Sequence, residues 1–140
     1  MPTLGNLPEN TIGEKIKKYR LLRGLTQKDL SIQTNIKLSA IGTYETDKIY
    51  PPIEKLKKIA TALDIDIYFL MDDYYKFICN NPKVFFRDLL AKSNLTVKEV
   101  SDFLDVHKTM YNRWLDGMLI RRDTYYKIKN KLIQLTTKEP

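Results

Sequence analysis

The sequence predicts an all-α protein made of two small helical bundles. Three observations predict this fold class. Apolar residues recur at helical spacing along the 140-residue chain, short capped helices alternate with tight turns, and the pattern of the first half returns in the second. Hydrophobic residues make up 43% of the chain, which is enough for a folded core. No apolar run approaches the roughly 20 residues that span a bilayer, so we expect no membrane segment.

The first bundle is expected over residues 11–72. Its first helix should cover about residues 12–23, with apolar side chains on one face. Gly24 follows directly, and glycine is the residue that most readily takes the left-handed conformation at a helix end. The apolar residues that predict this helix are Ile12, Ile16 and Tyr19.

Two short helices follow, separated by a sharp turn. Thr26 and the acid three residues later form a capping-box pattern, which predicts a helix ending near residue 34. Asn35 lies where the chain must turn, and asparagine tolerates positive φ better than most residues. The next helix is expected over about 38–46. Pro51-Pro52 then precedes a fourth helix, whose apolar positions are Ile53, Leu56, Ile59, Ala60 and Leu63.

This order of elements is the supersecondary unit that places its second short helix in the major groove of DNA. The stretch Leu25-Thr26-Gln27-Lys28-Asp29-Leu30-Ser31, then Asn35-Ile36, Ile41 and Tyr44-Glu45, resembles the Cro and phage-repressor (XRE-type) family of helix-turn-helix regulators. The resemblance implies a lambda-repressor-like DNA-binding domain. Ser31 and Asn35 depart from the alanine and glycine that are usual in the family, and both fit sterically.

The same resemblance implies roles for individual side chains. Gln27 would face a backbone phosphate, and Thr46 and Lys48 would lie near the phosphates beyond the recognition helix. Arg20 and Glu45 match a structural ion pair that holds the first and third helices together. The groove-facing side would carry Lys37, Leu38, Ser39 and Thr43. Because this face has few long amide or guanidinium groups, strong bidentate base readout is less obvious than usual.

The net charge of +7 is spread over both halves of the chain. Residues 11–72 carry a net charge of +3, and residues 82–140 carry +5. A basic balance favours a polyanionic partner such as double-stranded DNA, although many basic proteins bind no nucleic acid.

The second bundle, expected over residues 82–136, is a degenerate copy of the first. The shift that places Thr26 on Thr96 also places Tyr44 on Trp114, and it turns the ion pair into Leu90 and Leu115. Helices are expected at about 82–92, 97–104, 108–116 and 122–136, with about two extra residues inserted around 117–122. This half resembles the same family more weakly.

Two interpretations of the second bundle stay open. In one, a second DNA-binding set reads bases, with Arg113 on guanine, Asn112 on adenine and the pair Arg121 and Arg122 on phosphates. In the other, the bundle is a dimerisation domain, because the apolar groups around Trp114 are unusual at a DNA-facing edge. The residues of the candidate second set are His107, Lys108, Thr109, Asn112 and Arg113.

The remaining segments are an arm and a connector. Residues 1–10 have little pattern and are expected to be a mobile arm, and residues 136–140 are expected to fray. Residues 73–81 are the expected connector, and the stretch 64–81 around them is too aromatic for a flexible linker. Its apolar groups are expected to pack the halves together, to bury a subunit interface or to belong to the core of a single domain.

Other function classes find little support in the sequence. Cys79 is the only cysteine, which fits a reducing cytoplasm, and one histidine offers few options for catalysis or metal binding. We therefore expect no enzyme activity, metal, cofactor or small-molecule ligand. The favoured hypothesis is a homodimeric, cytoplasmic repressor. Its rivals are an antitoxin or anti-repressor-like module whose second half binds a protein partner, and a tandem binder that uses both recognition helices.

Overall fold

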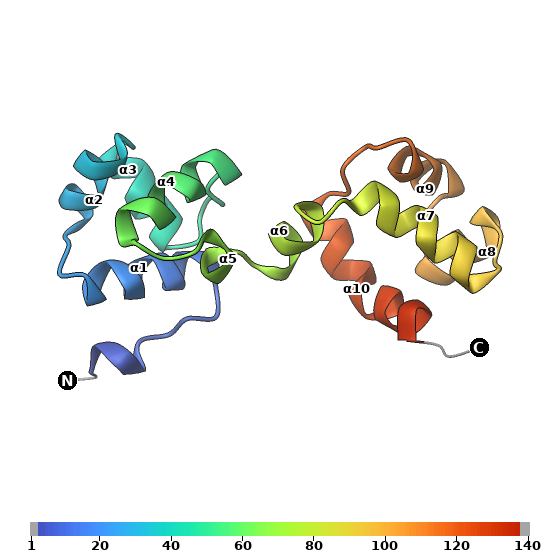
Figure 1. The fold of residues 1–140 in the computed structure, drawn as a ribbon, viewed down its shortest axis with the longest axis horizontal. Helices are drawn as coiled ribbons and strands as arrows, with labels where there is room; N and C mark the ends of the chain where they lie inside the picture. The colour runs from blue at the N-terminus through green and yellow to red at the C-terminus, as the bar shows by residue number, and fades with distance from the viewer. Residues whose placement is uncertain (1–2, 138–140) are drawn as a thin grey trace. The chain divides into compact units, whose positions relative to one another are not determined.

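The computed structural model describes residues 3–137, and all regular elements in that range are helices, which confirms the predicted all-α class. The chain divides into two compact units, with the boundary between Asp72 and Asp73. Figure 1 shows the helices of each unit along the chain. Among the described residues, no helix has both the length and the apolar character needed to cross a membrane.

The first unit packs its α-helices around one core. The helices are α1 (Ile12–Leu22), α2 (Gln27–Thr34), α3 (Leu38–Glu45), α4 (Ile53–Leu63) and α5 (Ile67–Leu70). Threonine hydroxyls cap the first turns of α1 and α2 in full capping boxes, so two helix starts are satisfied locally. α3 packs against both α1 and α2. The fully buried side chains at the centre include Ile16, Leu30, Ile41, Leu56, Ile59 and Leu63.

The second unit has an aromatic core. Its helices are α6 (Asp73–Ile78), α7 (Pro82–Ser93), α8 (Val97–Leu104), α9 (Lys108–Leu115) and α10 (Arg122–Thr137). The rings of Phe86 and Trp114 stack with centroids 4.9 Å apart, and the Tyr111 hydroxyl donates to the Phe86 carbonyl at 2.8 Å. This core is a buried cluster to which α7, α8, α9 and α10 all contribute.

The internal geometry of the first unit recurs in the second, at the offset that places Thr26 on Thr96. Helices α8 and α9 have the bounds of α2 and α3 shifted by that offset. The left-handed turn residues recur as well: Gly24 and Asn94, Asn35 and Asp105, and Asp47 and Gly117. Residues 82–137 therefore share the helix order and the turn positions of the first unit.

The offset changes between α9 and α10, in the direction opposite to the one expected. Buried Ile120 and Tyr125 correspond to Pro51 and Leu56, so the offset there is shorter by one. The expected insertion near 117–122 was therefore wrong, and one residue is missing instead. The apolar spacing of Leu56, Ile59 and Leu63 equals that of Tyr125, Ile128 and Leu132, so the sequence already contained this register.

Three expectations about the tails and the connector also need correction. Residues 73–81 form α6 and a turn, and Phe77 packs against Phe86 and Tyr125, so this segment is part of the second unit. Residues 3–10 include a 3-10 turn at Leu4–Asn6 and lie against α1, because the Lys18 ammonium binds the Gly5 carbonyl and Glu9. Residues 136 and 137 belong to α10, whereas residues 1–2 and 138–140 lie outside the described residues.

Candidate nucleic-acid interface

The turn between α2 and α3 sets the direction of α3. Asn35 takes the left-handed conformation with φ of 57°, and Ile36 then enters the core at 4% exposure. The Ser31 hydroxyl donates to the Ile36 carbonyl at 2.5 Å, a bond that alanine could not make. Both departures from the expected family pattern therefore suit the turn, one through its conformation and the other through an added hydrogen bond.

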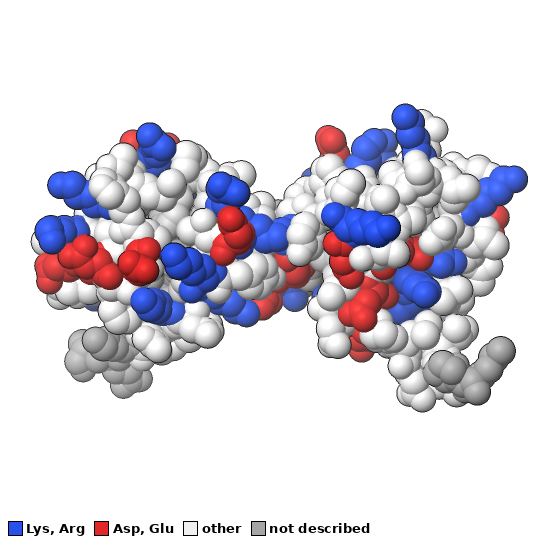
Figure 2. Space-filling model, turned by 180° about the vertical axis from the view of Figure 1, so that it is seen from behind, with Lys and Arg blue, Asp and Glu red and all other residues white. Residues whose placement is uncertain are grey.

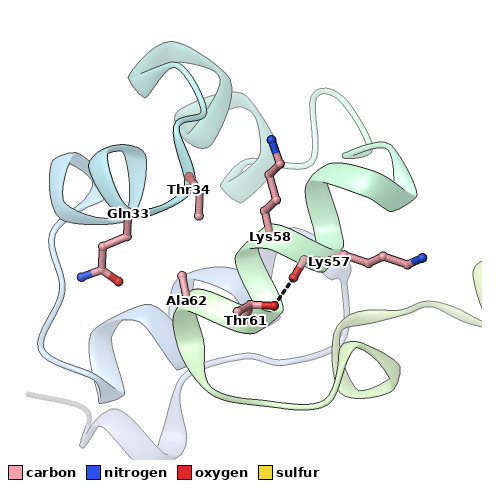
Figure 3. Close-up of a pocket in the computed structure, with 6 residues that line it drawn as sticks. All are labelled: Gln33, Thr34, Lys57, Lys58, Thr61 and Ala62. Atoms are coloured by element: carbon pink, nitrogen blue, oxygen red, sulfur yellow. Dashed lines mark hydrogen bonds between the residues drawn. The ribbon is translucent and has the colours of Figure 1, made fainter.

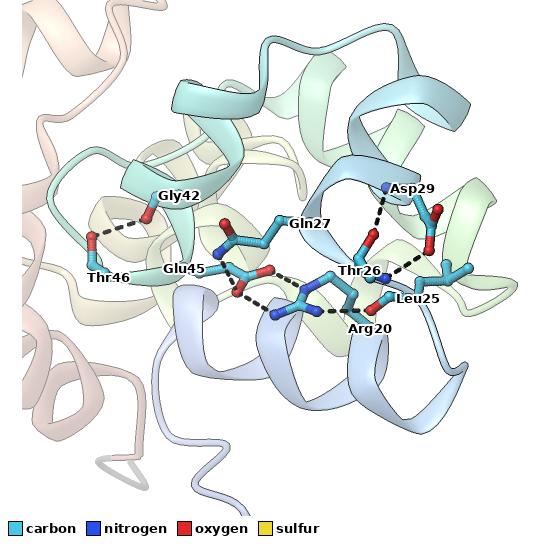
Figure 4. A network of polar contacts seen from close by, with 8 residues as sticks. All are labelled: Arg20, Leu25, Thr26, Gln27, Asp29, Gly42, Glu45 and Thr46. Atoms are coloured by element: carbon cyan, nitrogen blue, oxygen red, sulfur yellow. Dashed lines mark hydrogen bonds and ion pairs between the residues drawn. The ribbon is translucent and has the colours of Figure 1, made fainter.

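A buried polar network fixes α3 to α1 (Figure 4). The Arg20 guanidinium donates to both carboxylate oxygens of Glu45, at 2.6 and 2.9 Å, and also to the Leu25 carbonyl at 2.8 Å. The two side chains are only 8% and 2% exposed. The Gln27 amide donates to the same carboxylate at 3.1 Å. The expected ion pair is thus present, and Gln27 extends it into α2.

The exposed side of α3 carries small or apolar side chains. Leu38 is 48% exposed, Lys37 and Ser39 are exposed, and Thr43 is half-buried. The Thr43 hydroxyl donates to the Ala40 carbonyl at 2.8 Å, so it remains available to a ligand mainly as an acceptor. Lys37 is the N-cap of α3, Leu38 and Ser39 are its first two residues, and Thr43 lies one turn after Ser39.

The expected phosphate-contacting residues lie at two places beside α3. Gln27 is at the first position of α2, and Thr46 and Lys48 follow the end of α3 with exposed side chains. The Thr46 hydroxyl donates to the Gly42 carbonyl at 3.1 Å. The structure therefore places a lysine and a threonine beyond the recognition helix, as the sequence suggested.

Sequence reasoning missed Asp47, which holds the end of the recognition-helix segment against α1. Its carboxylate accepts hydrogen bonds from the Gly13 amide at 2.9 Å and the Thr11 hydroxyl at 2.5 Å. A Cβ at Gly13 would lie 2.3 Å from the Tyr44 carbonyl oxygen, so only glycine permits this approach. The only hint in the sequence was Gly13 itself, a glycine in the first turn of a helix. Its partner Asp47 is too distant in the sequence for the contact to be predicted.

The second unit presents a polar face on α9. Lys108, Thr109, Asn112 and Arg113 are all exposed, whereas Tyr111 and Trp114 are 0% and 1% exposed. Of the apolar residues that argued against a DNA-facing edge, Tyr111 and Trp114 are thus in the core, whereas Met118 and Leu119 are 42% and 53% exposed. His107 caps α9, because its Nδ1 accepts the Thr109 amide at 3.1 Å.

One proposed phosphate contact of the second unit has a different environment. The Arg122 guanidinium lies over the rings of Tyr74 and Tyr75, with its Cζ 4.6 and 4.4 Å from the ring centroids. Arg121 is exposed and pairs with Asp123 at 3.4 Å. Arg122 therefore joins α10 to α6, which is a structural contact that the sequence could not reveal.

Basic side chains lie on both units. On the face drawn in Figure 2, Lys and Arg side chains cover parts of each unit, with Asp and Glu side chains among them. Because basic and acidic side chains are interspersed, the surface charge alone does not locate a DNA site. The site must be argued from the residues of individual helices. Among the described residues, no group of three or more potential metal ligands lies together.

An open groove of about 460 Å³ lies between α2 and α4 (Figure 3). Its lining is mixed, and Lys57 and Lys58 extend outward from α4 in different directions. The Thr61 hydroxyl is already bonded to the Lys57 carbonyl at 3.0 Å. This groove has no convergent set of polar groups, and its lining residues are Gln33, Thr34, Lys57, Lys58, Thr61 and Ala62.

The helix order, the left-handed turn and the exposed α3 together define a DNA-binding protein of the helix-turn-helix class. Residues 16–70, which lie within the first unit, match the family model described as Helix-turn-helix. The second unit lies outside this match.

The chain is also similar to transcriptional regulators over much of its length. It is 25% identical to the HTH-type transcriptional regulator SinR of Bacillus subtilis (strain 168), over 69% of this chain and 92% of that protein. It is 26% identical to the HTH-type transcriptional regulator SinR of Bacillus licheniformis, with the same coverage of 69% and 92%. No solved structure gave a significant match.

Proposed function

We propose that the protein is a sequence-specific, DNA-binding transcriptional repressor that reads the major groove with α3. The observation that carries this proposal is the braced α2–turn–α3 unit within the helix-turn-helix match. Similarity to two proteins named as transcriptional regulators supports it. Repression follows from occupancy, because a protein seated on an operator excludes polymerase from an overlapping promoter.

The dimensions of α3 suit this role. An α-helix with its side chains is roughly 10–12 Å across, and the major groove is about 12 Å wide, so α3 can lie in the groove. In the proposed complex, Leu38 contacts a thymine methyl group, and the hydroxyls of Ser39 and Thr43 contact base edges. Lys37, at the helix start, and Lys48, beyond the helix end, contact the sugar–phosphate backbone on either side.

The buried network supplies the rigidity that such reading needs. Glu45 is held by Arg20 and Gln27 together, so α3 cannot rotate without breaking several charge-assisted hydrogen bonds. Gln27 has a second amide hydrogen in addition to the one given to Glu45. We assign that hydrogen to a DNA phosphate, so that α2 and α3 contact the same stretch of duplex.

The proposed functional form is a homodimer in the cytoplasm, where bacterial DNA lies. One small module contacts too few phosphates and bases to bind tightly by itself. A two-fold dimer would read two half-sites about 34–36 Å apart, which is one helical turn of DNA.

The test is selection of bound duplexes from a random pool with the full chain, followed by affinity measurements over a salt series. A recurring motif, with affinity that falls steeply as salt rises, is expected because binding releases counterions from phosphates. The absence of any enriched sequence would overturn the proposal. If the chain instead binds a protein with an affinity that does not change with salt, and binds no DNA, the second unit would be a protein-binding module.

A further inference from the structure

We propose that the second unit also reads DNA, through the exposed face of α9, and that the two units divide the work of recognition. On this view, which rests on the proposed function of the first unit, α3 and its flanks supply most phosphate contacts. α9 supplies bidentate base contacts on a neighbouring stretch of the same duplex, in addition to the base contacts proposed for α3. The stretch of DNA read by one chain is then longer than a single helix-turn-helix half-site and has two differently read segments.

The polar side chains on the exposed face of α9 make few contacts within the protein. The side chains of Lys108, Asn112 and Arg113 are exposed, and among residues 3–137 none of these side chains has a hydrogen-bond or ion-pair partner. With Thr109, they lie at helical spacing of one, three and four residues, which places them on one side of the helix. The opposite side is fixed by buried Tyr111 and Trp114.

The chemistry of this face matches base edges. An arginine donates two parallel hydrogen bonds to guanine, and an asparagine both donates to and accepts from adenine. In the first unit, the equivalent positions of α3 hold Gly42 and Thr43, which cannot make either bidentate contact. The base-reading groups that α3 lacks are therefore present on α9.

The flanking positions show the reverse distribution. Gln27, Thr46 and Lys48 of the first unit become Val97, Asp116 and Met118 in the second. Asp116 is exposed, so it would repel a phosphate rather than bind one. The second unit should therefore bind weakly by itself. It gains its effect because the first unit holds it near the duplex at an effective concentration on the order of millimolar.

The experiment compares three full-length proteins in duplex selection and affinity measurements. The first is the natural chain, and the second carries Asn112→Ala and Arg113→Ala. The matched control carries Lys127→Ala and Asn130→Ala, which removes the same kinds of group from α10. Fluorescence of Trp114, the one tryptophan of the chain, reports whether the second unit stays folded in each variant.

The expected result is a motif with two segments for the natural chain and the control. The α9 variant should lose sequence preference in one segment, keep the other, and bind its best site at least about tenfold more weakly. The proposal is overturned if the α9 variant selects the same motif with affinity within about twofold of the natural chain.

A second measurement separates DNA reading from self-association. The mass of each protein in solution is determined by light scattering without DNA. If the α9 variant changes the oligomeric state, α9 is a subunit contact and the DNA-reading proposal is wrong. If the natural chain selects no sequence at all, the proposed function of the first unit fails together with the α9 proposal. This outcome is distinct from a natural chain that selects a motif which the α9 variant leaves unchanged, where only the α9 proposal fails.

Discussion

Arg20 and Glu45 form a buried, bidentate ion pair between α1 and α3, and their counterparts in the second unit are Leu90 and Leu115. Both leucines are partly buried against the core of the second unit. The same junction between a first and a third helix is thus filled by opposite charges in one unit and by apolar groups in the other.

This relationship predicts a non-additive pair of substitutions. Arg20→Leu should lower the free energy of unfolding by about 3–5 kcal/mol, because it leaves the Glu45 carboxylate buried without its partner. Adding Glu45→Leu should recover at least half of that loss. Urea unfolding followed by circular dichroism measures both changes. A double variant less stable than either single variant would contradict the prediction.

The close approach at Gly13 predicts a large effect from a small change. Gly13→Ala should destabilise the first unit by about 1–3 kcal/mol or more, since the added carbon would overlap the Tyr44 carbonyl oxygen. Gly42→Ala is the matched control, because its added carbon meets only the Gln27 side chain at 4.0 Å. That variant should be neutral or more stable by up to about 1 kcal/mol. Equal thermal stability of the two variants would refute this explanation.

The left-handed residue in the α2–α3 turn predicts different effects for two substitutions at the same position. Asn35→Ala should destabilise the fold by about 1–2 kcal/mol, because alanine lacks the short polar side chain that lets asparagine adopt φ of 57° at little cost. Asn35→Gly should leave stability within about 0.5 kcal/mol of the natural chain, since glycine adopts this conformation freely. Both variants are compared by urea unfolding. If alanine proves as stable as glycine, the turn does not depend on that conformation.

The capping box of α2 predicts a pH dependence. Hydrogen bonds from the Thr26 backbone amide, and then from its side chain, lower the pKa of Asp29 below its ordinary value of 3.8. The folded state therefore binds the proton less readily than the unfolded state. The stabilisation is complete above about pH 3.8 and is lost as the pH falls through the lower pKa of the folded state. The free energies of unfolding of the natural chain and of Asp29→Asn should therefore converge below that pH. A difference that stays constant with pH would show that the Asp29 carboxylate is not the source of the pH dependence.

The position of Lys48 predicts a loss of affinity that does not depend on sequence. Lys48→Ala should weaken binding to specific and non-specific duplexes by a similar factor, and should reduce the slope of log affinity against log salt by about one. Lys17→Ala removes an exposed charge from α1 and serves as the control. An unchanged slope for Lys48→Ala would show that this ammonium does not contact a phosphate.

Local features of the structure could be predicted from the sequence. Thr26 and Thr96 begin α2 and α8, and Gly24, Asn35 and Asn94 take the left-handed conformation after helices. These features depend on a few neighbouring residues, so a short stretch of sequence contains their cause. The Arg20–Glu45 pair was also predicted, although from family resemblance, because its residues are far apart in the chain.

Only the tertiary structure determined which helix faces are exposed to solvent and which residues far apart in the sequence are in contact. The sequence showed that α9 holds both aromatic and basic groups, but burial of Trp114 alone shows that the basic groups face solvent. The link from Asp47 to Gly13, the position of Arg122 over two tyrosines and the inclusion of α6 in the second core depend on packing between separate helices. Such contacts have no local signature, because they arise only when the helices close around a shared core.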